Sequence, residues 1–185
     1  MKEILEKILE LEKLDFTEAV DLYKNTGLSM LMWLGNEVRK KKVPGKQARW
    51  IIDRNINITN ICTSRCSFCN FHRTKKDSDG YITGMGEYRQ KINELFELGG
   101  NQVLLQGGLH PDLGLSFYKD LFSELKREFP ELQLHALGPP EIHDLALKEN
   151  KSYNFILNEL ISSGLDSLPG AGAEILCDEV RSKIS

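Results

Sequence analysis

The chain has 185 residues, 41% hydrophobic and 28% charged, a composition typical of soluble globular proteins. Its net charge of −3 argues against nucleic acid as a bulk partner, and no apolar run approaches the roughly 20 residues that span a bilayer. The N-terminus lacks the apolar core of a secretory signal, so we expect a cytoplasmic protein without a membrane partner.

Residues 1–48 are predicted to form an N-terminal helical segment. Asp15 and Glu18 have the spacing of a capping box, which predicts the start of a second helix that ends near Gly27. A third helix is expected to follow and to end at Pro44, since proline does not continue a helix.

Strands alternate with helices from residue 49 to residue 185. Strands are predicted over 50–58, 102–105, 132–137 and 165–168. Helices are predicted between them over 87–98, 116–129 and 152–164. This alternation indicates an α/β fold with a parallel sheet and right-handed crossovers. We expect four β-α units of a TIM-like barrel, incomplete here because a closed barrel takes about 250 residues.

Three cysteines follow the first predicted strand with the spacing Cys-x3-Cys-x2-Cys: Cys62, Cys66 and Cys69. A [4Fe-4S] cluster usually takes four thiolates, so three would leave one iron free for another ligand. Structural zinc takes four protein ligands, and His72 could be the fourth, so a zinc site stays open. Four cysteines in 185 residues disfavour a disulfide framework. The isolated Cys177 is interpreted as a small buried hydrophobe.

Two glycines, Gly107 and Gly108, follow the second predicted strand. Adjacent glycines at a strand end allow a ligand or another backbone to approach closely, although a plain strand–helix turn would also explain them. His110 lies just beyond. A single histidine is more often structural, but its place at the end of a strand makes it a candidate substrate ligand or proton carrier.

Polar side chains also accompany the third and fourth strands. His135 lies in the third strand, and Glu141 begins the next helix, where its carboxylate either suits the helix dipole or faces a bound ammonium group. Asp166 and Glu174 are candidates for contacts with hydroxyl or ammonium groups. The small residues 170–173 could form an anion-binding nest, but the Gly-Lys-Ser/Thr ending of a phosphate loop is missing, which argues against nucleotide hydrolysis.

The cysteine spacing resembles the cluster loop of the radical S-adenosylmethionine (SAM) superfamily. Further runs narrow the resemblance to the cyclic dehypoxanthinyl futalosine synthases of menaquinone biosynthesis: 53–62, 106–115, 139–142 and 164–176. Aminofutalosine synthases and radical enzymes of deazaflavin coenzyme synthesis are the alternative relatives. The chain resembles only the N-terminal half of such an enzyme. Leu109 stands where the glycine motif usually ends in glutamate, and Gly138 and Ala171 are further departures.

The resemblance implies a [4Fe-4S] cluster on the three cysteines, with SAM bound to its open iron. The implied cofactor-binding positions are Phe68, Gln106, Gly107, Gly108 and Glu141. The implied substrate-side positions are His110, His135, Asp166 and Glu174, of which His110 and Glu174 are also catalytic candidates. The ring of Phe68 would lie near the adenine of SAM or cover the cluster as a core aromatic.

The resemblance further implies a radical SAM oxidoreductase that cyclises a small molecule, dehypoxanthine futalosine. Such an enzyme would need an electron donor such as flavodoxin or ferredoxin. Two other interpretations remain open: a small metal-binding module without catalytic activity, and an inactive half-enzyme.

Overall fold

A computed structural model describes residues 1–46, 50–170 and 175–184 of the chain. The chain divides into two compact units, Met1–Trp50 and Ile51–Ser185. Each unit has buried apolar side chains of its own. Among the described residues, no helix is long and apolar enough to cross a membrane.

The first unit consists of helices: α1 (Lys2–Leu9), α2 (Phe16–Asn25) and α3 (Leu28–Lys42). The capping box predicted before α2 is confirmed. The Asp15 carboxylate accepts a hydrogen bond from the Glu18 N–H, and the Glu18 carboxylate accepts one from the Asp15 N–H. Lys7 of α1 forms an ion pair with Glu18 at 2.5 Å, which joins the first two helices.

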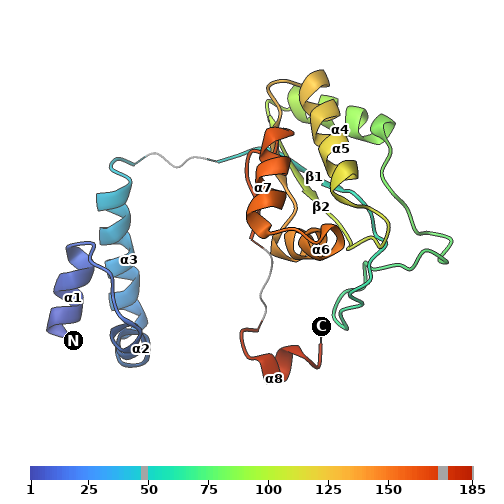
Figure 1. Ribbon diagram of the computed structural model, residues 1–185. Coiled ribbons are helices and arrows are strands. Elements are labelled where there is room, and N and C mark those ends of the chain that lie inside the picture. The colour runs from blue at the N-terminus through green and yellow to red at the C-terminus, as the bar shows by residue number, and fades with distance from the viewer. Residues whose placement is uncertain (47–49, 171–174, 185) are drawn as a thin grey trace. The chain divides into compact units, whose positions relative to one another are not determined.

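The second unit is built on a parallel sheet of strand order β1-β2-β3, as the alternation of elements predicts (Figure 1). The strands are β1 (Asp53–Asn57), β2 (Gln102–Gln106) and β3 (Gln133–Ala136). The helices are α4 (Met85–Glu97), α5 (Leu115–Glu128), α6 (Pro139–Glu149), α7 (Tyr153–Ser162) and α8 (Asp178–Arg181).

The first and fourth strands differ from the prediction. β1 begins at Asp53 because pairing with β2 starts there, and Trp50 is 85% exposed despite its apolar character. The predicted strand at 165–168 is reduced to one isolated bridge between Ser167 and His135. Pro169 follows two residues later, and its missing N–H cannot extend a ladder.

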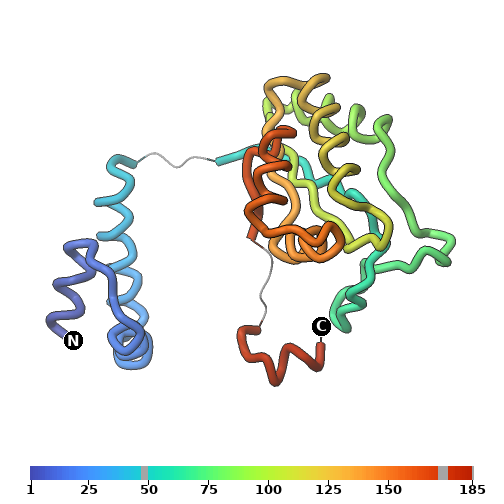
Figure 2. Tube along the Cα trace, in the orientation of Figure 1, coloured from blue at the N-terminus to red at the C-terminus, as the bar shows by residue number. Residues whose placement is uncertain are grey.

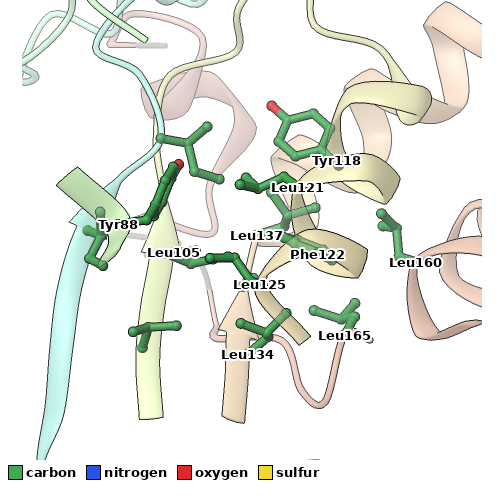
Figure 3. Close-up of a cluster of buried hydrophobic side chains, with 14 of the residues drawn as sticks. Tyr88, Leu105, Tyr118, Leu121, Phe122, Leu125, Leu134, Leu137, Leu160 and Leu165 are labelled. Carbon is green, nitrogen blue, oxygen red and sulfur yellow. The ribbon is translucent and has the colours of Figure 1, made fainter. Parts of the chain in front are cut away.

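The two faces of the sheet differ in chemistry because successive side chains of a strand point to opposite sides. Ile56, Leu105 and Ala136 lie on one face and are fully buried. Figure 3 shows Leu105 in this core with Phe122 and Leu125 of α5. The opposite face carries aligned polar side chains. Asn57 pairs in register with Gln106, and both are only half-buried.

The loops that follow the strands all leave from the carboxyl edge of the sheet. Residues 58–84 connect β1 to α4 in a long excursion beyond the sheet (Figure 2, teal to green). Residues 107–114 connect β2 to α5, and 137–138 lead directly into α6. Parallel α/β folds place their chemistry at this edge.

Candidate metal centre

The cysteine loop is anchored by two buried polar residues that lie shortly after the end of β1. Thr59 and Asn60 are 0% and 6% exposed. The Thr59 hydroxyl donates to the Tyr81 carbonyl at 2.5 Å, and the Asn60 amide donates to the Asp79 carbonyl at 2.8 Å. These bonds tie the start of the loop to its far end. Sequence reasoning did not single out either residue, although two polar residues shortly after a strand were a usable signal.

All three cysteines of the loop are free thiols and are partly exposed. The backbone N–H of Leu109 donates to the Cys62 sulfur at 3.3 Å, so the loop after β2 lies against the first cysteine. Among the described residues, no three His, Cys, Asp or Glu side chains converge as metal ligands. Because metal binding is coupled to local folding, closure of an eight-residue loop around a cluster is consistent with this arrangement.

His72, the alternative zinc ligand, lies at the end of the same loop. Its Nδ1 is 2.8 Å from the Cys69 carbonyl oxygen, which only accepts hydrogen bonds. Nδ1 therefore carries the proton, and the lone pair is on Nε2. The imidazole orients the last cysteine of the loop through this bond.

Gly107 and Gly108 are required by the close approach of the loop after β2 to the start of the cysteine loop. A Cβ atom on Gly108 would lie 2.3 Å from the Ile61 carbonyl oxygen and 2.8 Å from the Cys62 Cβ. A Cβ on Gly107 would lie 2.9 Å from the Thr59 carbonyl oxygen. The glycines thus have a packing role, and contact with a cofactor stays a prediction for them.

Gln106, which precedes these glycines, is half-buried on the polar face of the sheet. Its carbonyl accepts the Ile58 N–H at 2.8 Å, which extends the pairing of the two chains beyond β1. Its side chain lies level with Asn57. Gln106 therefore presents an amide at the point where the polar face meets the cysteine loop.

His110 is buried, with 4% of its surface exposed. Its Nδ1 accepts the Asp112 N–H at 3.1 Å, so the proton of the neutral ring is on Nε2. Burial lowers its pKa, which favours this neutral form. Lys148 of α6 donates to the His110 carbonyl at 2.5 Å and to the Leu113 carbonyl at 3.4 Å. Through these two bonds Lys148 fixes the loop after β2. The sequence pattern gave no indication of this role for Lys148.

Glu141 is a buried carboxylate in the first turn of α6. Burial raises its pKa, and the backbone amides of Glu141 itself, Gly138 and Gly107 partly offset this effect. Glu141 has no ion-pair partner within the described part of the chain. The preceding Leu137 has φ of 60°, a left-handed conformation uncommon for leucine. The chain thus bends sharply to bring Glu141 beside the glycine motif of β2.

Two further residues that were predicted to contact the substrate, His135 and Asp166, lie in different parts of the structure. His135 lies on the polar face of the sheet, and its Nδ1 is 2.7 Å from the Ser167 hydroxyl. Asp166 accepts the Leu134 N–H at 2.7 Å and forms an ion pair with Lys126 at 2.6 Å. These partners lie near the start of β3, away from the cysteine loop. The structure brings Gln106, His110 and Glu141 toward the cysteines, but not Asp166.

Phe68 and Glu174 complete the predicted set. Phe68 is 54% exposed within the cysteine loop, so it does not cover a core in the structure. Glu174 lies outside the described residues. The isolated Cys177 is exposed, which corrects its interpretation as a buried hydrophobe.

A pocket of about 550 Å³ opens beside the first cysteine. Its walls combine Cys62 and Pro111 with three cationic side chains, Arg65, Lys75 and Lys76. The cysteine loop therefore meets solvent in a positively charged environment.

Two solved structures resemble this fold. Methylornithine synthase (PylB) aligns with 98% of this chain and 50% of its own, with a TM-score of 0.68 at 19% identity. The FeFe-hydrogenase maturase HydG from Carboxydothermus hydrogenoformans aligns with 91% of this chain and 47% of its own, with a TM-score of 0.55 at 19% identity. At such identities the likeness shows the fold, here part of a TIM-like α/β barrel preceded by helices.

Curated relatives are closer in sequence. Cyclic dehypoxanthine futalosine synthase of Halalkalibacterium halodurans is 36% identical over 98% of this chain and 49% of that protein. The enzyme of the same name from Streptomyces coelicolor is 38% identical over 91% of this chain and 43% of that protein. A 5-amino-6-(D-ribitylamino)uracil–L-tyrosine 4-hydroxyphenyl transferase of Cyanothece is 35% identical over 96% of this chain and 49% of that protein.

The chain spans about half the length of the curated relatives that it matches. Residues 56–176, which contain the cysteine loop and all three strand-end loops, match the radical SAM superfamily. Because this match covers more than half of the chain, the protein belongs to the radical SAM superfamily of enzymes.

Proposed function

We propose that the chain carries the cluster- and SAM-binding half of an enzyme that cyclises dehypoxanthine futalosine in the futalosine route to menaquinone. The observation that supports this proposal is the likeness, along 98% and 91% of the chain, to two curated cyclic dehypoxanthine futalosine synthases. The proposed compartment is the cytoplasm, since its reducing environment keeps thiolate ligands intact.

The residues at the carboxyl edge of the sheet fit the cofactors of this superfamily. Cys62, Cys66 and Cys69 supply three free thiols from one partly exposed loop. These three thiolates would hold a [4Fe-4S] cluster, which usually takes four, and would leave one iron free for SAM. The Leu109 N–H already donates to the Cys62 sulfur, and such bonds to ligand sulfurs tune the potential of a cluster.

When bound, the cluster and SAM would supply the one-electron chemistry that starts the reaction on the substrate. The chain's own part is to bind, orient and exclude water. Phe68 offers an exposed ring for the adenine of SAM. Gln106, Gly107 and Gly108 offer backbone and amide groups next to the first cysteine.

Glu141 is the proposed acceptor for the ammonium group of SAM. A carboxylate that is buried without a cationic partner is unfavourable in its charged form, which is why burial raises its pKa. A ligand ammonium at hydrogen-bond distance would lower this pKa and stabilise the carboxylate. Glu141 would in this way compensate for Leu109, which stands at the usual position of a glutamate.

The substrate is proposed to lie against the polar face of the sheet. His135 and Gln106 present hydrogen-bonding groups there. His110 would act as a neutral imidazole with its proton on Nε2. Asp166 and Glu174 remain proposed substrate contacts, although Asp166 already has two partners near the start of β3.

A second candidate function is transfer of a 4-hydroxyphenyl group to 5-amino-6-(D-ribitylamino)uracil, a reaction related to deazaflavin synthesis. It is favoured by the 35% identity to the Cyanothece transferase over 96% of the chain. Both candidates need the same cysteine loop, so only the substrate distinguishes them.

The test incubates reconstituted protein anaerobically with SAM and a low-potential reductant. Dehypoxanthine futalosine is added to one sample, and tyrosine with ribitylaminouracil to another. We expect deoxyadenosine and methionine, and a cyclic product from dehypoxanthine futalosine alone. The assay is run on the 185-residue chain and on a version extended to the length of the relatives. Product from the tyrosine sample alone would overturn the proposal in favour of the transferase.

A further inference from the structure

The two ends of the cysteine loop meet at one residue, Arg73. Its backbone lies beside the first cysteine: the Arg73 carbonyl accepts the Cys62 N–H at 2.9 Å, and the Arg73 N–H donates to the Asn60 carbonyl at 2.8 Å. Its side chain bonds the segment that follows the third cysteine, residues 70–72. Arg73 therefore contacts both the entry and the exit of the loop.

The exit of the loop, residues 69–72, contains neither helix nor strand, so no ladder of backbone bonds holds its carbonyls. Nη1 of Arg73 donates to the Asn70 carbonyl at 3.2 Å and to the His72 carbonyl at 2.9 Å. The His72 ring donates to the Cys69 carbonyl at 2.8 Å. Two side chains thus fix three carbonyls next to the last thiol of the loop.

The guanidinium of Arg73 is itself held from the opposite side. Its Nε donates to Oδ2 of Asp79 at 2.7 Å. The Asp79 carbonyl in turn accepts the side-chain amide of Asn60 at 2.8 Å, and Asn60 is buried shortly after β1. A continuous series of hydrogen bonds therefore runs from the end of β1 through Asp79 and Arg73 to the exit of the cysteine loop.

The shape of arginine matters here more than its charge. The Arg73 and Asp79 side chains are 35% and 61% exposed, so solvent weakens the attraction between their charges. The planar guanidinium directs Nε at the carboxylate and Nη1 at the two carbonyls in a rigid fork. Lysine keeps the charge, but its compact ammonium group on a flexible stem does not fix acceptors in this way.

We propose that Arg73 is a positioning residue for the metal centre. Its guanidinium holds the backbone after Cys69 so that the third thiolate faces the same metal as the thiolates of Cys62 and Cys66. This inference rests on the proposed cluster function. Arg73 acts through the backbone of the loop and not as a ligand, and partners that orient ligands in this way tune metal affinity and potential.

The experiment compares the wild-type chain with R73K, which keeps the charge and removes the fork, and with D79A, which keeps Arg73 and removes the anchor of its Nε. The matched control is R89K. Arg89 of α4 also donates its Nε to a carboxylate, that of Glu128 at 2.8 Å, and is similarly exposed, but its bonds join two helices outside the cysteine loop.

Hydrogen exchange of the Cys69 and Arg73 amides is measured first, on the chain without metal. We expect about tenfold faster exchange in R73K and a smaller increase in D79A, because bonds to a charged donor are lost or loosened. R89K should exchange at the wild-type rate. The unfolding midpoint of the second unit should stay at the wild-type value in all three variants.

The reconstituted proteins are then compared by iron content, by the rate of iron loss to a chelator and by electron paramagnetic resonance with SAM. R73K should lose iron on the order of tenfold faster and give a cluster spectrum that differs from the wild type. R89K should match the wild type in every property.

Wild-type exchange in R73K would overturn the proposal. Faster exchange with wild-type iron retention and spectrum would also overturn it, since Arg73 would then have a structural role alone. If R73K lowers the unfolding midpoint, D79A decides between these outcomes by the same measurements. Absence of a cluster from the reconstituted wild type would instead contradict the proposed function.

Discussion

Substitution of Gly108 by alanine tests how closely the glycine motif of β2 must approach the cysteine loop. The added Cβ would lie 2.3 Å from the Ile61 carbonyl oxygen, whereas ordinary contact begins at 3.4 Å. The two backbones would have to separate by about 1 Å, at a cost of about 2–3 kcal/mol in the free energy of unfolding. The displaced atoms belong to Ile61 and Cys62, so we also expect the reconstituted variant to retain less iron.

The assay combines chemical unfolding of the second unit with iron and sulfide analysis after reconstitution. Gly86→Ala is the matched control, because no atom lies within 4 Å of its added Cβ on α4. Alanine there should be neutral or should stabilise the helix by up to about 1 kcal/mol. A Gly108→Ala variant with wild-type stability and full iron content would refute the reasoning that this glycine is required by close packing.

Three further changes have distinct expected outcomes. Cys62→Ala should lose most iron after reconstitution, whereas Cys177→Ala should keep it, because Cys177 is exposed and lies outside the cysteine loop; equal loss in both would contradict the ligand assignment. Glu141→Gln should stabilise the free protein at neutral pH and weaken SAM binding. Burial raises the folded pKa of Glu141. Its contribution to stability is therefore fully present below the unfolded pKa of about 4.5 and is lost as pH rises through the folded pKa. If unfolding of the variant kept the wild-type pH dependence, this explanation would be wrong. Lys148→Met should destabilise the protein by about 1–2 kcal/mol and speed amide exchange in residues 109–114, since two backbone carbonyls lose their donor; unchanged exchange would show that Lys148 does not hold this loop.

Sequence periodicity predicted the parallel sheet, because each strand was bounded by turn residues and separated by amphipathic helices. The start of β1 was misplaced since Trp50 and Ile51 are apolar but have no strand opposite them. The fourth strand was overestimated because one bridge at Ser167 is all that forms before Pro169. Pairing depends on a partner strand, and composition alone does not reveal one.

The site was predictable where its residues are close in sequence and hidden where they are distant. The cysteine spacing and the paired glycines were visible in the sequence. The reason for Gly108, by contrast, is the position of Ile61, which is 47 residues earlier. Lys148 reaches His110 across 38 residues. Only the folded chain shows such contacts, because no local pattern records them.

The central claim is that three thiolates hold a [4Fe-4S] cluster whose fourth iron binds SAM. Its most direct test is electron paramagnetic resonance of the anaerobically reconstituted, reduced chain with and without SAM, together with metal analysis. We predict about four irons per chain and a cluster signal that changes when SAM is added. One zinc per chain, or an iron–sulfur signal that SAM leaves unaltered, would contradict the claim.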